Sequence, residues 1–423
     1  MAGFGFTPDD AGDDSNRDNF EAMMRQMQEQ IKAQFEQLGL AGAPNIAGLF
    51  SSSPSEILPL ASIRDAARTT TSASGSQPIG TNDHTAVSHA CEIAELWLNE
   101  ATVFPAPTTS GVPAISRLDW VDATAPGFQK TMQPLAQGLT DAVGRLLDEA
   151  MAAHSDNAQM APVASLLKSF IGGMIATQLG QAIGAISTKA TGAHDCGLPL
   201  IDPARPLLIP ENIELWSAES EIPKTEVYLF HALRESAIAR LFDHNPWIVS
   251  YMRSAITEYG RGIRIDLDAI TRQAEEMMNG QIEESFTIAL DKGIFTPEET
   301  PQQREALAKL ETALALVDGW ADEVATLAAG DRLPSIVSLR ELHRRNRAEQ
   351  SPAAQLFKTL LGLEVSPRLT REASAFWSRI REIKDIHGRD QIWSGILPTA
   401  TELLAPDLFL SSTQIPDDPS SLF

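Results

Sequence analysis

The chain has 423 residues, of which 43% are hydrophobic and 21% charged. This composition excludes collagen-like, wholly disordered and coiled-coil proteins, and it leaves enough apolar material for a substantial core. The 33 Lys and Arg residues are outnumbered by 56 Asp and Glu, which gives a formal net charge of −23. Because a field of that sign repels phosphate backbones and anionic lipid, nucleic acid and membrane surfaces are poor candidate partners.

Cysteine usage and the first residues of the chain both bear on cellular location. The only two cysteines, Cys91 and Cys196, are far apart and cannot build a disulfide framework or a Cys-based zinc ribbon. The N-terminal sequence is acidic and Gly-rich and lacks the basic and apolar regions of a signal peptide. These features predict a cytoplasmic protein.

The N-terminal part of the chain differs in composition from the rest. Residues 1–19 carry five aspartates and predict a disordered acidic tail. Residues 20–40 place apolar side chains at spacings of three and four, typical of an amphipathic helix that packs on its own domain or, alternatively, binds a partner. The Ser/Thr-rich sequence ARTTTSASGSQPIGTND follows as a linker. Residues 20–82 therefore form a helix-plus-linker segment, and a helical domain is predicted for 83–423, with a candidate sub-boundary near 200–220.

Helical periodicity dominates the remainder and strand-like alternation is scarce, so the fold is predicted to be mainly α. Twenty uncharged residues at 169–188 are long enough to span a bilayer. Gln178, Gln181 and several Ser and Thr residues are costly in lipid, so a buried helix is favoured over a membrane span. Its four glycines would allow another helix to approach closely. Asp83 is the predicted N-cap of a helix that follows it. Further helices are predicted at 226–242, 248–260, 267–292, 301–329, 335–349, 353–361 and 369–386.

The segment TEVYLFHALRESAIARLFDHNPWI predicts a helix that begins near Thr225 and ends before Pro246. This segment and others along most of the chain resemble the zincin-like metallopeptidase type 2 family of zinc-dependent hydrolases. The resemblance implies a large helical zincin-like domain and a hydrolase or metallopeptidase activity. The other similar segments are CEIAELWLNEAT, TQLGQAIGAIS, CGLPLI, EYGRGIRIDL, TPQQREALAKLETALALVDGWADEV, LRELHRRNRA, LFKTLLGLEVSPRLTREASAFWSRI and RDQIWSGILPTA.

The motif that this resemblance implies is His-Glu-x-x-His on a helix. Two His residues four positions apart lie on one helix face and can reach one metal, while the Glu polarises the metal-bound water. The matching positions here are Arg234-Glu235-Ser236-Ala237-Ile238. Glu235 keeps the general-base position. Arg234 stays protonated and Ile238 has no donor atom, so both ligand positions are degenerate.

A third ligand would come from a later helix. The stretch LETALALVDGWADEV is similar to the family's third-ligand region and implies Asp318 as the residue nearest the site, with Glu311 on the same face. Asp318 would either pair with Arg234 or ligate a metal. In the metal alternative, His231, Glu235 and Asp318 supply one imidazole and two carboxylates, a set suited to zinc, manganese or iron. The family pattern has no His at the position of His231. The metal alternative is therefore supported only by the four-residue spacing of His231 and Glu235, which places both on one helix face.

Two further features contain ligand-type residues. His194-Asp195-Cys196 lies on a Gly-bounded loop, where adjacent side chains point in different directions, and a turn is predicted. The basic run from Arg340 to Arg347 could contact nucleic acid, but an exposed helix that neutralises nearby acidic surface is favoured.

Two functions from different classes follow from these observations. In the favoured one, the chain is a non-catalytic binding or scaffold member of the family, a pseudoenzyme without a cofactor whose partner is an unidentified protein or peptide. In the alternative, it is an active metallohydrolase with zinc at a rearranged site of His231, Glu235 and Asp318. A pair between Arg234 and an acidic residue would indicate the first function.

Overall fold

The computed structural model describes residues 57–108, 111–152, 161–263, 300–361 and 369–413. The predictions for the acidic tail, the amphipathic segment at 20–40 and the helix at 267–292 lie outside these ranges. Every regular element within the described ranges is a helix, apart from isolated bridges that pair Leu208 with Ala114 and with Gly192. The prediction of a mainly α fold is therefore confirmed.

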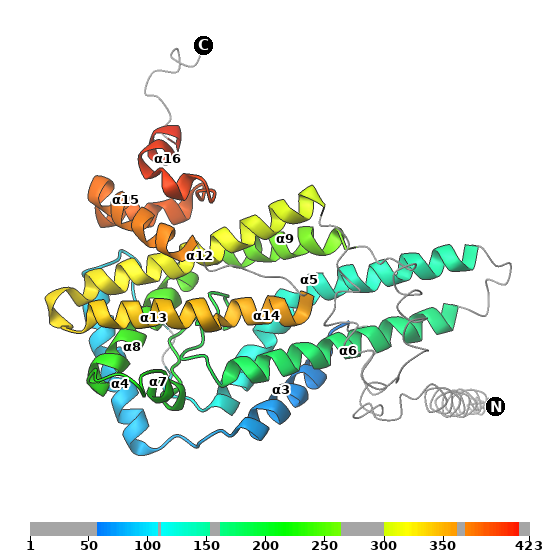
Figure 1. The fold of residues 1–423 in the computed structure, drawn as a ribbon, viewed down its shortest axis with the longest axis horizontal. Helices are drawn as coiled ribbons and strands as arrows, with labels where there is room; N and C mark the ends of the chain where they lie inside the picture. Colours follow the sequence, from blue (N-terminus) through cyan, green and yellow to red (C-terminus); the bar gives the residue numbers. More distant parts are fainter. Residues whose placement is uncertain (1–56, 109–110, 153–160, 264–299, 362–368, 414–423) are drawn as a thin grey trace, which may run out of the picture.

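The helices follow one another along the chain (Figure 1), with longer connections at 99–116 and 188–209. α12 has the bounds predicted for it, whereas the helix predicted at 226–242 begins two residues earlier, after Pro223 and not after Thr225, and ends two residues later, at His244. Asp83 is not an N-cap: it lies in the first turn of its helix and accepts the backbone N–H of Gly80. The described helices are α3 (Leu60–Ser74), α4 (Thr81–Leu98), α5 (Arg117–Ala152), α6 (Ala161–Ser187), α7 (Pro210–Trp216), α8 (Lys224–His244), α9 (Trp247–Arg261), α12 (Pro301–Ala329), α13 (Ile336–Gln350), α14 (Pro352–Leu361), α15 (Thr370–Gln391) and α16 (Pro406–Thr413), with 3-10 turns at Gly330–Arg332, Ile392–Ser394 and Glu402–Leu404.

Helices α3 and α6 pack closely together, which accounts for the small-residue sequence of α6. A Cβ at Gly180 or Gly184 would overlap atoms of α3, so the glycines permit the approach that was predicted for this helix. Residues 67–74 were expected to belong to the linker, but they form the second half of α3, where Ala67 and Thr71 are buried. No helix in the described ranges has both the length and the apolar character needed to cross a bilayer.

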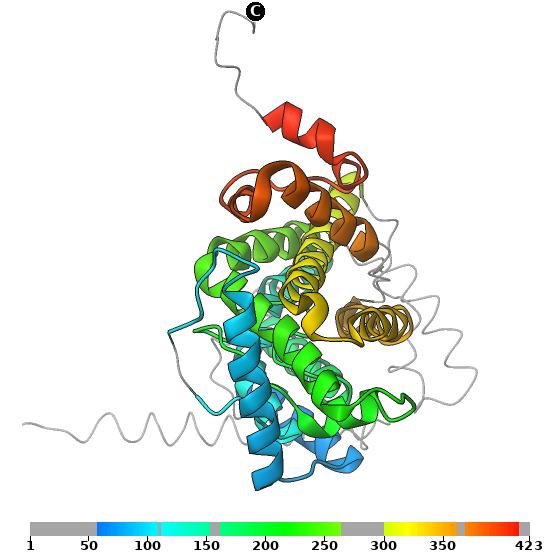
Figure 2. The same ribbon diagram turned by 90° about the vertical axis from the view of Figure 1, so that its left-hand side faces the viewer.

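Helix α8 lies in the middle of the molecule and carries the pentad 234–238. All of its side chains from Val227 to Phe242 are buried, because neighbouring elements cover it on every side. Helices α4 and α12 pack along it, and Figure 2 shows α4 beside α8, while α7 and α13 cover further parts. Polar side chains on α8 therefore meet other elements of the protein and must find partners there.

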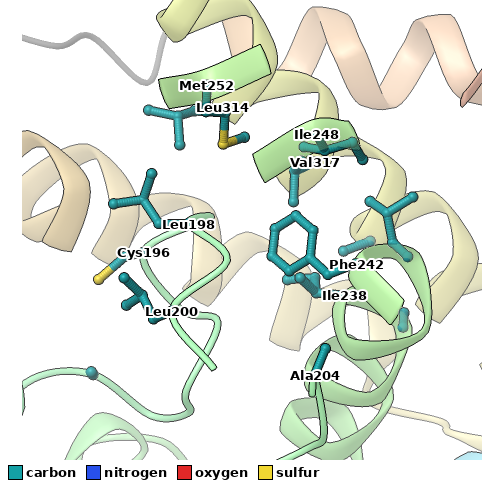
Figure 3. Packing of buried hydrophobic residues seen from close by; sticks show 14 of the residues in the cluster. Cys196, Leu198, Leu200, Ala204, Ile238, Phe242, Ile248, Met252, Leu314 and Val317 are labelled. Atoms are coloured by element: carbon teal, nitrogen blue, oxygen red, sulfur yellow. The ribbon is translucent and has the colours of Figure 1, made fainter. Parts of the chain in front are cut away.

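The segment between α6 and α7 packs against α8, and its middle part is buried in the core. Ile209 N donates to Thr191 O at 3.0 Å, and Ala193 N donates to Leu207 O at 3.0 Å, so the two ends of this segment are held together. Further along, Leu198 lies toward Met252 of α9 and Leu314 of α12 (Figure 3). This packing fixes the segment against the helices that carry the candidate site.

The C-terminal helices are joined to α12 by tryptophan packing. The Trp393 ring lies 5.2 Å from the Trp377 ring and 6.4 Å from the Trp320 ring, between centroids. Trp320 also donates its indole N–H to Asp390 at 2.9 Å. α12 packs against both α8 and α15, and its acidic residues Asp322 and Glu323 are buried, while the Asp318 side chain is 15% exposed.

Candidate functional site

Arg234 extends from α8 toward α12, where it forms a hydrogen-bonded ion pair with Asp318. Its second terminal nitrogen lies 3.7 Å from a carboxylate oxygen of Asp322, one turn further along α12. The Arg234 and Asp318 side chains are only 6% and 15% exposed, so the pair is largely removed from water. Arg234 therefore pairs with an acidic residue, the arrangement expected of a non-catalytic protein.

The pair continues into a chain of buried charged and polar groups. The His343 Nε2 atom lies 3.7 Å from Asp318 and accepts a hydrogen bond from Arg347 Nε at 3.3 Å. Arg347 in turn donates to Asp195 at 2.5 Å. We call these five residues, Arg234, Asp318, His343, Arg347 and Asp195, the buried ion-pair chain. It joins α8, α12, α13 and the segment between α6 and α7.

The pKa values indicate which groups in this chain carry charge. Burial by itself would raise the pKa of Asp318, but Arg234, His343 and Arg347 outweigh it and hold that pKa well below the usual range. Burial and the adjacent Arg234 lower the pKa of His343 to about 4. Arg347 keeps the pKa of Asp195 low against the effect of burial. At neutral pH two guanidinium groups thus balance two carboxylates across a neutral imidazole.

Asp322 is the centre of a second, adjoining cluster. It accepts two hydrogen bonds from Arg340, at 2.9 and 2.6 Å, one from Arg344 at 3.3 Å and one from Ser374 at 2.7 Å. Burial opposes ionisation, but Arg340, Arg234 and Ser374 lower the pKa of Asp322 to about 2. The basic run of α13 was expected to neutralise acidic surface. Most of it instead neutralises buried carboxylates, and its exposed member Arg345 lies 3.8 Å from Glu341.

Glu235 points away from Arg234 and fastens the segment between α6 and α7. One carboxylate oxygen accepts from Ala193 N at 2.9 Å, from Leu207 N at 3.2 Å and from the His194 imidazole, whose Nδ1 lies 2.8 Å away. The other oxygen accepts from His194 N at 3.2 Å. A Cβ at Gly192 would overlap this carboxylate, so a glycine is required for the approach. The residue at the general-base position is thus fully engaged in structural hydrogen bonds.

His231 lies one turn before Glu235 but has a different environment. Its ring packs edge-on against Trp216 at 4.6 Å and against Phe230 at 5.5 Å between centroids. Burial lowers the pKa of His231 to about 3, and its Nε2 atom is buried without a hydrogen-bond partner. This imidazole is therefore neutral and has an unused nitrogen. Ile238 is buried in the core near Phe242 (Figure 3) and offers no ligand atom.

The residues at the motif positions do not fit the zinc site of the family's motif. Arg234 brings a fixed positive charge and Ile238 an alkyl group to the two positions where the motif has imidazoles. Within the described residues, no three His, Cys, Asp or Glu side chains are arranged to hold a metal ion. Of the rearranged trio, Glu235 is bonded to His194, Asp318 is paired with Arg234, and His231 packs against aromatic rings. The rearranged metal site stays a prediction.

The turn His194-Asp195-Cys196 and the basic run of α13 contribute more to the site than their sequences indicate. His194-Asp195-Cys196 does form a turn, as predicted, but His194 binds Glu235 and Asp195 binds Arg347. The sequence offered two signals: His194 and Asp195 lie next to glycines, and arginines are concentrated in α13. Joining them required knowing that the segment between α6 and α7 lies between α8 and α13.

A helical domain with a glutamate at the second position of a pentad that aligns with His-Glu-x-x-His defines the class of protein. A family described as zincin-like metallopeptidase matches residues 60–410, and the chain belongs to this family. No curated protein matches the chain. Its structure is similar to that of a protein from Chloroflexus aurantiacus described as a candidate hydrolase with a novel fold, with a TM-score of 0.57 and 14% identity over 84% of this chain and 98% of that one. At that identity the likeness is one of fold.

Proposed function

We propose that this chain is a non-catalytic member of the zincin-like metallopeptidase family that works in the cytoplasm as a binding or scaffold protein for a protein or peptide partner. The observation that carries the proposal is the ion pair of Arg234 with Asp318. A guanidinium group lies at the first ligand position of the motif, and it is neutralised by the carboxylate of the third-ligand region. Catalysis by the family's motif would need an imidazole at that position.

The state of Glu235 supports the same proposal. A general base must be free to accept a proton from a water molecule, within hydrogen-bond reach and with an available lone pair. Glu235 is only 4% exposed and accepts hydrogen bonds from three backbone N–H groups and from one imidazole. In this arrangement its carboxylate stabilises the fold and is shielded from solvent.

A second candidate function is favoured by one observation at His231. The partnerless buried Nε2 atom of this neutral imidazole is the kind of group that binds a metal or an ordered water. An active metallohydrolase with zinc bound by His231, Glu235 and Asp318 would use it. That site requires Asp318 to leave Arg234 and Glu235 to leave His194, so binding of the metal would have to compensate for both losses.

Metal content distinguishes the two functions. Untagged protein, a His231→Phe variant and a Glu235→Gln variant would be analysed by elemental mass spectrometry, before and after incubation with zinc and removal of the excess. The non-catalytic proposal expects far less than one metal per chain in all three proteins. An Arg234→His, Ile238→His double variant, which completes His-Glu-x-x-His, controls for the ability of the method to detect a bound metal.

Near-stoichiometric metal in the wild type that is lost in His231→Phe would overturn the proposal. A peptidase activity of the wild type that disappears in Glu235→Gln, with the helical circular dichroism spectrum unchanged, would overturn it independently.

A further inference from the structure

A surface pocket lies between α5 and α9, away from the buried ion-pair chain. Its volume is about 350 Å³, which is within the range of small-molecule sites. On α5 it is lined by Lys130, Gln133, Pro134 and Gln137, which share one face because they are three and four residues apart. Arg253 lines it from α9.

The packing of the two helices explains why a hollow exists here. A Cβ at Gly138 would overlap the backbone carbonyl of Gly260, so α5 and α9 are in backbone contact at these glycines. The lining residues all precede that contact in their own helices. Gly260 also lies close to the backbone of Pro134, so the hollow lies beside this contact and is bounded by the side chains that line it. Pro134 also lacks a backbone N–H, which leaves the carbonyl of Lys130 without its usual helical donor.

The pocket has a positive character that the rest of the protein does not share. Lys130 and Arg253 have no ion-pair partner among the described residues, although the chain carries 56 acidic residues. The Arg253 Nε atom is buried and has no hydrogen-bond partner. The amide of Gln137 is already used, since it donates to Asp141 at 2.8 Å. The free donors are therefore the ammonium group, the guanidinium group and the Gln133 amide.

We propose that this pocket binds a small, multiply charged oxyanion through Lys130 and Arg253. A guanidinium fork matches the geometry of a phosphate or carboxylate group, and a lysine ammonium adds a compact second charge. The volume accommodates a ligand with more than one such group. This binding supplies the negative charge that the described residues do not offer to Lys130 and Arg253, and it is independent of the non-catalytic function proposed for the α8 site.

Isothermal titration calorimetry on the full chain tests the site, with inorganic pyrophosphate and citrate as separate probes. The buffer contains neither phosphate nor other polyvalent anions and has a constant low ionic strength, because such binding is screened by salt. The test variants are Lys130→Gln and Arg253→Gln, which keep a polar side chain and remove the charge. The matched control is Lys384→Gln, an exposed lysine on α15 outside the pocket.

At least one probe is expected to bind the wild type, and each test variant is expected to bind it about tenfold or more weakly, since hydrogen bonds to charged groups contribute that much. Lys384→Gln should leave the affinity within about twofold, as expected for a distant surface charge. Preference for pyrophosphate or for citrate assigns the ligand to the phosphates or to the carboxylates. No binding of either probe to the wild type, or equal losses in the control and test variants, would overturn the proposal.

Discussion

Removing both partners of the Arg234–Asp318 pair should cost clearly less than the sum of the costs of removing each partner alone. We consider Arg234→Met, Asp318→Asn and the double variant. Loss of one partner from a buried ion pair costs about 3–5 kcal/mol, because the other charge remains buried and unpaired. The lower end applies here, since Arg234 keeps Asp322 at 3.7 Å and Asp318 keeps the nearby positive charge of Arg347. Each single variant should lose about 3 kcal/mol of unfolding free energy. The double variant should lose less than the sum of the two, by about 2 kcal/mol or more.

Equilibrium urea unfolding at pH 7 in the presence of a chelator measures these differences. Lys309 and Glu258 provide a matched control, because their atoms lie 3.5 Å apart but the side chains are 42% and 45% exposed. The same cycle with Lys309→Met and Glu258→Gln should give a coupling below about 1 kcal/mol. If the effects of Arg234→Met and Asp318→Asn simply add to within about 0.5 kcal/mol, the two charges are not compensating each other and the reasoning is refuted.

Three further predictions follow from the same site. The free energy of unfolding should fall as the pH drops from about 6.5 toward 4, because the folded pKa values of His231 and His343, about 3 and about 4, are depressed and the unfolded chain takes up protons first. Urea titrations across this range should show that the dependence of unfolding free energy on pH is smaller by about 1.4 kcal/mol per pH unit in His231→Phe than in the wild type. An unchanged pH dependence would contradict the buried neutral imidazole. Gly192→Ala should lower the free energy of unfolding by about 2 kcal/mol, within the range for overpacking, because its Cβ overlaps the Glu235 carboxylate. This loss of stability should be smaller in a Glu235→Ala background. Equal losses in both backgrounds would place the clash elsewhere. Chelation of the purified protein should leave its urea midpoint unchanged, because guanidinium groups neutralise the buried carboxylates; a large downward shift would show that a bound metal contributes to folding.

The sequence predicts the helices well and the site only in part. The helix at 301–329 could be placed to the residue because Thr300, Pro301 and Gln303 form a capping box with a proline at the first helical position. α3 was not predicted, because its Thr-rich second half shows no apolar period and packs against glycines of α6. The Arg234–Asp318 pair could be anticipated from the motif positions, since both residues occupy places that a family motif defines.

The remaining members of the buried ion-pair chain could not be predicted, for a physical reason. Asp195 and Arg347 are 152 residues apart and meet only because the segment between α6 and α7 is held against α8 by Glu235. Their pairing depends on tertiary packing, which periodicity and motif spacing do not encode. An arginine-rich run looks the same in the sequence whether its charges face water or buried acids.

Charge balance explains how this fold can contain the carboxylates of a metallopeptidase motif without the motif's imidazoles. A buried carboxylate such as Asp318 needs a positive neighbour, and a metal ion or a guanidinium group can each provide that charge. Here Arg234 provides it permanently, and its charge does not depend on metal supply or on pH. A single change of Arg234 to His would remove this charge and leave Asp318 with a neutral His343, while Ile238 would still lack a ligand atom. A metal site with the ligands of His-Glu-x-x-His therefore requires both motif positions to change, since neither Arg234 nor Ile238 offers a ligand atom.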